Sequence, residues 1–119
     1  MADIKATAGA VHNLETKADF DKYITGGEGV AVLDAFAEWC GPCKMIAPHI
    51  KTMSEKTDKV KFYKFDVDAL PAVAQELNIR AMPTFIVYKD GEEVQKIVGA
   101  NIKAIETAIA SADASESKE

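Results

Sequence analysis

The sequence is poor in positive charge and has no long hydrophobic run. It contains 14 Lys and Arg against 19 Asp and Glu, which gives a formal net charge of -5. A nucleic acid or an anionic membrane needs a basic surface that neutralises its phosphates, so neither is an expected partner. The longest apolar stretch, residues 30–37, is interrupted by Asp34 and is far shorter than the roughly 20 residues that span a bilayer. We therefore expect no transmembrane helix.

The N-terminal residues lack the marks of a targeting segment. Residues 1–10 have neither the continuous apolar core of a secretory signal nor the arginines of a transit peptide. We therefore expect a cytoplasmic protein, and the nucleus is compatible with the same features.

The amount of core material indicates one folded domain. The chain has 119 residues, of which 48% are hydrophobic, enough for a single core and too many for a disordered protein. We place the domain at residues 10–112, after an N-terminal extension at 1–9 and before a polar, mobile tail at 113–119.

The spacing of apolar residues predicts an α/β fold with a central mixed sheet. Residues 29–37 are apolar on both faces, as in a central strand covered by helices on each side. Asp90-Gly91 is a strong signal for a tight hairpin between the last two strands. Asp66 to Asp68 is interpreted as a strand end followed by a helix cap. We expect about five strands and four helices: strands at 10–12, 29–37, 60–67, 84–88 and 94–98, and helices at 16–24, 43–55, 70–77 and 102–109.

The two cysteines, Cys40 and Cys43, stand where the central strand meets an amphipathic helix. A structural disulfide that closes a loop of about four residues contributes only about 2 kcal/mol in the chain-entropy model. A redox role therefore explains the pair better than a structural one. Backbone N–H groups and the dipole at a helix N-terminus favour a thiolate, which is the attacking form in disulfide exchange.

The positions of the two sulfurs indicate different roles. Cys40, at the rim, is the predicted nucleophile, and Cys43, one turn into the helix, is the predicted resolving thiol. Pro42 fixes the backbone near the helix start, where a missing N–H costs little, and Gly41 allows close approach of a partner backbone. As an alternative, His12 and His49 would complete a Cys₂His₂ zinc site, but His49 is expected to point away from the cysteines. We expect no metal.

The segment Trp39-Cys40-Gly41-Pro42-Cys43-Lys44 resembles the active-site motif of the thioredoxin family. The similarity extends from about residue 12 to residue 110 and includes Asp34, Pro48 and the segments 81–84 and 98–100. It implies the thioredoxin fold, a lowered cysteine pKa and a reducing potential.

Asp34 is an acid within the most apolar strand. An ionised carboxylate without partners is costly there, so burial should raise its pKa. The resemblance implies that Asp34 lies behind Cys43 and moves its proton during resolution. The alternative is an acid at a solvated strand end. Lys64 matches a lysine that neighbours this aspartate in the family, and is otherwise a solvated strand charge.

The resemblance also implies a groove that docks an extended client peptide. The proline matching Pro83 is cis in thioredoxins and faces the cysteine pair, and the backbone of the preceding Met82 pairs with the substrate chain. Trp39 belongs to the groove, the alternative being ordinary core packing. The expected groove residues are Trp39, Gly41, Pro42, Ala81, Met82, Pro83, Val98, Gly99 and Ala100.

One position departs from the family pattern. Thioredoxins commonly have a large aromatic residue directly after the strand aspartate, whereas this sequence has Ala35. The smaller side chain puts the local packing in doubt, and we expect a cavity that neighbouring side chains fill.

The function that the resemblance implies is general protein-disulfide reduction in cell redox homeostasis. It implies no bound cofactor, electrons from NADPH through the flavoprotein thioredoxin reductase, and clients such as ribonucleotide reductase, peroxiredoxins and methionine sulfoxide reductases. A disulfide-forming oxidase or isomerase of this fold usually has a histidine between its cysteines, so Gly41-Pro42 favours the reducing type. A binding module that uses the groove without its cysteines is the other alternative. We expect mainly a monomer.

Overall fold

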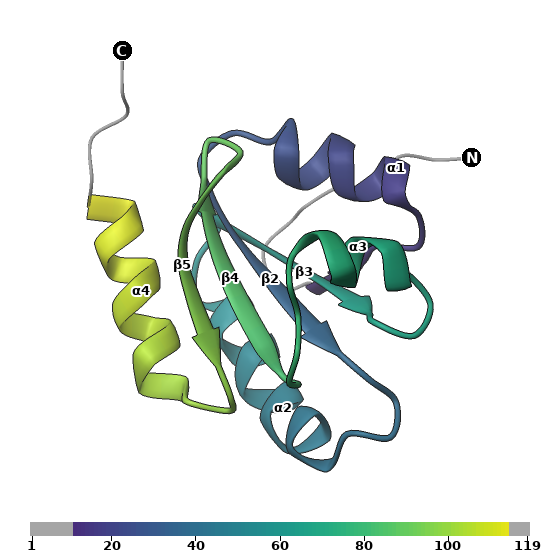
Figure 1. Cartoon of the computed structure of the whole chain (residues 1–119). Helices are drawn as coiled ribbons and strands as arrows, with labels where there is room; N and C mark the ends of the chain where they lie inside the picture. Colours follow the sequence, from purple (N-terminus) through teal and green to yellow (C-terminus); the bar gives the residue numbers. More distant parts are fainter. Residues whose placement is uncertain (1–10, 115–119) are drawn as a thin grey trace.

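The computed structural model describes residues 11–114, arranged as a five-stranded mixed sheet between two layers of helices (Figure 1). The expected extension at 1–9 lies outside this range. The strand order is β1-β3-β2-β4-β5, with β1, β3 and β2 parallel and with β4 antiparallel to both β2 and β5. The strands are β1 (Val11–Asn13), β2 (Val30–Phe36), β3 (Val60–Asp66), β4 (Thr84–Lys89) and β5 (Glu92–Val98).

Helices cover both faces of the sheet, as the apolar pattern of β2 predicts. One core cluster joins the sheet to α2 and α4, and the other joins it to α1, the following π-helical turn η1, and α3. The helical elements are α1 (Lys17–Phe20), η1 (Asp21–Thr25), α2 (Gly41–Glu55), α3 (Pro71–Glu76) and α4 (Ile102–Ala114). The sequence analysis missed the π-helical geometry of η1. None of the helices within residues 11–114 is long and apolar enough to cross a membrane.

The central strand and the hairpin agree with the sequence. The first six residues of β2 are buried, Asp34 among them. Asp90 and Gly91 form a two-residue turn between β4 and β5 with φ values of 51° and 85°, the left-handed backbone that a tight hairpin requires. A Cβ on Gly91 would collide with the carbonyl oxygen of Thr25, so the hairpin tip packs closely against the end of η1.

Three details of the helices differ from the sequence-based expectation. Helix α4 continues to Ala114, and its buried residues are Ile105, Ala108 and Ala112, so Ala112 belongs to the core and residues 113 and 114 continue the helix. The predicted cap at 66–68 is wrong, because α3 begins after Leu70 and no side chain caps it. The helical spacing of Ile46, Ala47 and Ile50 predicts that all three lie on one apolar stripe of α2, yet Ala47 is exposed.

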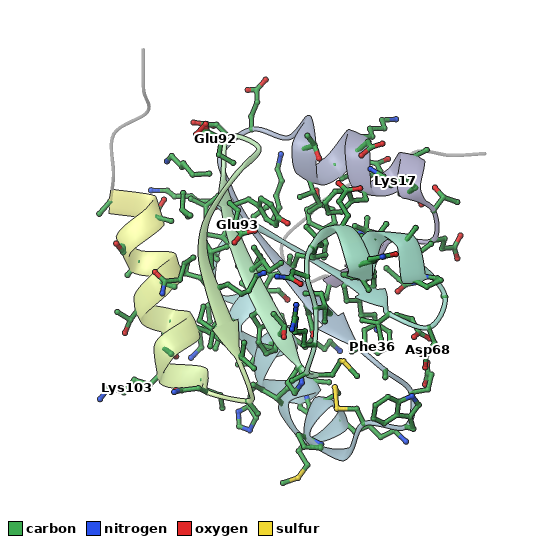
Figure 2. All side chains as sticks on the ribbon, in the orientation of Figure 1. Lys17, Phe36, Asp68, Glu92, Glu93 and Lys103 are labelled. Atoms are coloured by element: carbon green, nitrogen blue, oxygen red, sulfur yellow. A yellow bond between two sulfur atoms is a disulfide. The ribbon has the colours of Figure 1, made fainter. Side chains whose placement is uncertain are left out.

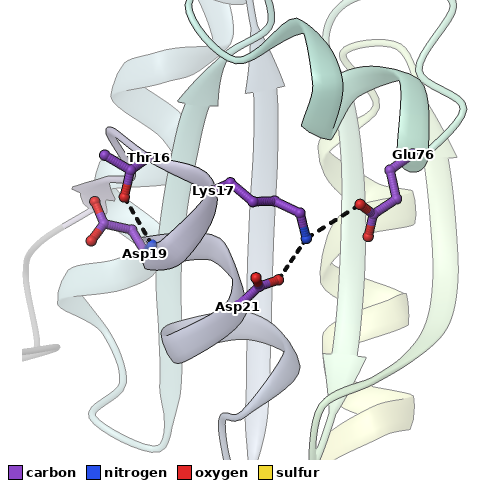
Figure 3. A network of polar contacts seen from close by, with 5 residues as sticks. All are labelled: Thr16, Lys17, Asp19, Asp21 and Glu76. Atoms are coloured by element: carbon purple, nitrogen blue, oxygen red, sulfur yellow. Dashed lines mark hydrogen bonds and ion pairs between the residues drawn. The ribbon is translucent and has the colours of Figure 1, made fainter.

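The first helix begins after Thr16, whose side chain caps it. The Thr16 hydroxyl accepts a hydrogen bond from the Asp19 N–H at 3.0 Å. Lys17 Nζ then contacts Asp21 Oδ1 at 2.7 Å and Glu76 Oε1 at 3.2 Å, which links α1 and η1 to α3 (Figure 3). These side chains are about half exposed, so solvent screens the ion pairs and they contribute little to stability.

Replacing Thr16 with alanine is expected to lower the free energy of unfolding by about 1 kcal/mol, because the Asp19 N–H loses its capping acceptor. Urea denaturation followed by circular dichroism measures this loss. Thr52→Ala is the matched control, since Thr52 lies within α2 and its hydroxyl only donates back to the Pro48 carbonyl. An equal loss in both variants would contradict the capping role.

Candidate active site

The two cysteines form a disulfide at the N-terminus of α2. Figure 2 draws the sulfur atoms of the side chains in yellow. Their Cα atoms are 5.3 Å apart. Cys40 is the N-cap residue and Pro42 lies in the first turn, as the sequence predicts. The Cys43 N–H donates to Cys40 Sγ at 3.1 Å. A thiolate on Cys40 would therefore meet a backbone donor and the positive end of the helix dipole.

Access to the two sulfurs differs less than the sequence suggests. Cys40 is 4% exposed and Cys43 is 6% exposed, so in the disulfide form Cys40 does not stand out at the rim. Both pack with Ala37 and with the partly buried side chain of Met82. What distinguishes the sulfurs is their surroundings, because Cys40 Sγ accepts the backbone hydrogen bond and Cys43 lines an open cavity.

Trp39 stands in the open beside the disulfide. It is 68% exposed, which contradicts ordinary core packing. Its Nε1 donates to Asp68 Oδ2 at 2.9 Å, from the loop after β3 (Figure 2). This contact ties the loop before α2 to the loop before α3. The sequence analysis missed Asp68 as a site residue, since nothing in the sequence pairs positions 29 residues apart.

The expected groove residues before β4 and at the end of β5 meet at Pro83, and Met82 packs against the cysteine pair. The Met82–Pro83 peptide bond is cis, as the resemblance implies. The Gly99 N–H donates to the Pro83 carbonyl at 2.8 Å, and Thr84 pairs with Val98. Val98 is 62% exposed, and Gly41, Pro42, Ala81 and Ala100 are exposed as well. Trp39 and the first turn of α2 are thus exposed beside the cysteine pair, and Met82 and Pro83 connect that pair to the exposed end of β5.

Asp34 lies in the interior of the protein. It is 6% exposed, which contradicts a solvated strand end, and its Oδ1 is buried without a hydrogen-bond partner. Burial raises the pKa of Asp34 to about 7, and the positive charge of Lys64 opposes this rise. Asp34 and Cys43 line the same cavity of about 510 Å³, so the carboxyl group and Cys43 border the same space.

Lys64 is the register partner of Asp34 on β3 and lines that cavity too. Its Nζ lies 5.5 Å from the centre of the Phe36 ring. The structure thus places Lys64 beside the buried acid, as the resemblance implies. Asn13 and Lys44, which the sequence analysis did not select, also line the cavity.

The comparisons with known proteins agree with this geometry. The sequence model of the thioredoxin family matches residues 11–111. The chain belongs to the thioredoxin family. Thioredoxin-2 of Saccharomyces cerevisiae is 48% identical over 101 residues, which cover 85% of this chain and 97% of the relative.

Two solved thioredoxin-system structures extend the similarity to three dimensions. The thioredoxin Mala s 13 of Malassezia sympodialis has a TM-score of 0.83 at 40% identity, covering 96% of this chain and all of the other. The second structure was solved for the thiol resolving mechanism of a yeast mitochondrial 1-Cys peroxiredoxin via the glutathione and thioredoxin systems. It has a TM-score of 0.80 at 37% identity, and the match covers 88% of this chain and 98% of the other. This member of the thioredoxin family is a thiol–disulfide oxidoreductase with a redox-active Cys40–Cys43 pair.

Thioredoxin-family proteins generally bind no cofactor, and residues 11–114 contain no group of three His, Cys, Asp or Glu side chains placed to hold a metal ion. His12 lies on β1 with its ring 6.1 Å from that of Tyr63, and His49 is exposed on α2. The structure therefore does not gather the ligands of the zinc alternative.

Ala35, the departure from the thioredoxin pattern, is fully buried. It lies in the cluster that contains Phe65, Val73 and Ile86, and Phe65 is its register partner on β3. Large neighbouring side chains thus surround the position that an aromatic residue commonly takes in the family.

Proposed function

We propose that this protein is a general reductant of protein disulfides in which Cys40 attacks and Cys43 resolves. The observation that carries the assignment is the hydrogen bond from the Cys43 N–H to Cys40 Sγ at the start of α2, because it favours the thiolate on Cys40. The Cys40 thiolate forms a bond to one client sulfur, and the other client sulfur leaves as a thiolate. The Cys43 thiolate then attacks Cys40 Sγ, releases the second client thiol and forms the Cys40–Cys43 disulfide. Two electrons pass to the client.

Asp34 is proposed to move the proton of Cys43. A carboxyl group with a pKa of about 7 is half ionised near neutral pH, so it can accept the thiol proton during resolution and return it in the reverse reaction. The shared cavity of about 510 Å³ supports this transfer. Lys64 stabilises the ionised form of Asp34, because its positive charge lowers the pKa of the carboxyl group.

The exposed apolar groove is proposed to hold the client as an extended segment. The Met82 backbone, next to Pro83, would pair with the segment, while Trp39 and Val98 contribute apolar surface on either side. Gly41 supports close approach, because a Cβ at this position would meet open space rather than other atoms. The groove carries few charges, which suits clients of varied sequence.

The partners and location follow from the family. We propose re-reduction by an NADPH-dependent flavoprotein thioredoxin reductase and clients of the ribonucleotide reductase, peroxiredoxin and methionine sulfoxide reductase types. The similarity to the structure solved for a 1-Cys peroxiredoxin supports the second of these. We propose a cytoplasmic monomer that holds no bound cofactor.

Reduction of insulin disulfides with dithiothreitol as electron donor tests the proposed reaction. We expect fast precipitation of the insulin chains with the wild-type protein, and the rate of dithiothreitol alone with a Cys40→Ser, Cys43→Ser double variant. Equal background rates would favour the binding module, in which the cysteines are dispensable. Faster oxidation of reduced client proteins than reduction of insulin would instead favour the oxidase alternative.

A further inference from the structure

A second open cavity, of about 600 Å³, lies between α2 and the β1 side of the sheet, where residues of β1, β3 and β2 line it. Its volume is in the range of small-molecule sites. It contains none of the groove residues, and it adjoins the Cys43 cavity, with which it shares Asp34, Lys44, Ala47 and Lys64. Its walls also include Val11, Pro48, Ile50 and Lys51.

The charges around this cavity are unbalanced. Three lysines line it: Lys44 and Lys51, two turns apart on α2, and Lys64 on β3. Within residues 11–114 none of these three ammonium groups lies within 4.0 Å of a carboxylate oxygen, although the charge of Lys64 acts on the buried Asp34. Asp34, the acid in the lining, is 6% exposed. The rim is therefore positive and open to an external anion.

The rest of the lining is apolar, with one exception. Val11, Ala47, Pro48 and Ile50 offer hydrocarbon surface. The exception is Asp34, whose buried Oδ1 has no hydrogen-bond partner. A protonated carboxyl group at this position can donate a hydrogen bond, and a carboxylate head group is a suitable acceptor.

We propose that this cavity binds an anionic amphiphile of the medium-chain carboxylate class. Its head group lies among Lys44, Lys51 and Lys64, and its alkyl chain packs against Val11, Pro48 and Ile50. Burial of the alkyl chain supplies the affinity, and the lysines select the charged head group. The binding site goes beyond the disulfide chemistry, because neither cysteine lines it.

Binding is coupled to the protonation of Asp34. A carboxylate beside Asp34 disfavours a second negative charge, so the ligand raises the pKa of Asp34 and binds more tightly when Asp34 is protonated. Phe85, which pairs with Asp34 on β4, does not titrate. Asn13 of β1, which lines the Cys43 cavity with Asp34, does not titrate either. The neighbouring His12 has its ring beside that of Tyr63. The charged groups that share a cavity with the carboxyl group come from α2, β3 and the β2–α2 loop: Lys44, Lys51, Lys64, Asp66 and Glu38.

Octanoate titrated into the oxidised full-length protein, followed by ¹H–¹⁵N NMR, tests the site. We expect saturable shifts at the amides of Val11, Ala47 and Ile50. Lys51→Glu should weaken binding about tenfold, equivalent to about 1.4 kcal/mol, because it places a negative charge at the head group. Lys56→Glu is the matched control, since Lys56 is exposed at the C-terminal end of the same helix and outside the cavity, and it should leave the affinity unchanged.

Two further measurements distinguish binding at this cavity from nonspecific attraction of an anion to the lysines. Octanamide, which has the same chain and no charge, should bind at least about tenfold more weakly. Octanoate should bind more tightly at pH 6 than at pH 8, on either side of the Asp34 pKa of about 7, and Asp34→Asn should remove this difference. Unsaturable shifts, shifts centred on Trp39 and Val98, or equal weakening by both lysine variants would overturn the proposal. These readouts use the oxidised protein and require no reductase activity, so they remain valid if the proposed function fails.

Discussion

The Cys43→Ser variant is expected to accumulate as a mixed disulfide with its client through Cys40. Without the second thiol, attack by Cys40 still forms the bond to the client sulfur, but no group on the protein can displace it. Multiple-turnover reduction of insulin should fall to the rate of dithiothreitol alone. Non-reducing electrophoresis and mass spectrometry should detect the adduct, and an excess of dithiothreitol should release it.

Cys40→Ser is the matched control for this experiment. Both variants lose the same disulfide, and its loop is so short that the loss costs about 2 kcal/mol in either case. A difference between the variants therefore reports on the role of each sulfur rather than on folding. We expect no adduct with Cys40→Ser. An adduct on Cys43 in that variant, formed at the rate seen for Cys40, would reverse the two assignments.

Asp34→Asn is expected to change how stability depends on pH. The pKa of Asp34 rises from 3.8 in an exposed setting to about 7 in the folded protein. Between these values the unfolded chain has released the proton that the folded protein still holds, so the free energy of unfolding falls as pH rises. The fall is complete above pH 7 and amounts to about 4 kcal/mol for a shift of this size.

Urea denaturation of the oxidised protein at pH 4 and pH 8 measures this effect. The free energy of unfolding of the wild type should fall by up to about 4 kcal/mol more than that of Asp34→Asn when the pH is raised from 4 to 8. Glu38→Gln is the control, because Glu38 lines the same cavity from an exposed position. A wild-type pH dependence that both variants share would show that Asp34 is not the group responsible.

The parts of this fold that could be predicted have local signals. The double-sided apolar run of β2 identifies a central strand, and Asp90-Gly91 identifies a two-residue hairpin because its backbone favours positive φ. Thr16 identifies a helix start because its hydroxyl can accept a hydrogen bond from a backbone N–H of the first turn. The cysteine pair lies at a strand-to-helix junction, so its position and its chemistry could be derived together.

The parts that could not be predicted depend on contacts distant in sequence. Asp68 is a residue type that often caps helices, yet its carboxylate accepts a hydrogen bond from Trp39 Nε1 and α3 begins later, at Pro71. The burial of Ala112 depends on the sheet against which α4 packs. The exposure of Ala47 follows from how α2 is rotated on the sheet. Periodicity shows that a helix has an apolar face but does not fix that rotation to within one residue.

The two edges of the sheet have a consequence for how the protein behaves at high concentration. Within residues 11–114, edge β1 comprises three residues, and edge β5 begins with the exposed acids Glu92 and Glu93. Pairing of two copies through these edges would bring like charges together at β5 and would find few backbone groups in the described part of β1. The sheet is therefore a poor template for the growth of aggregates.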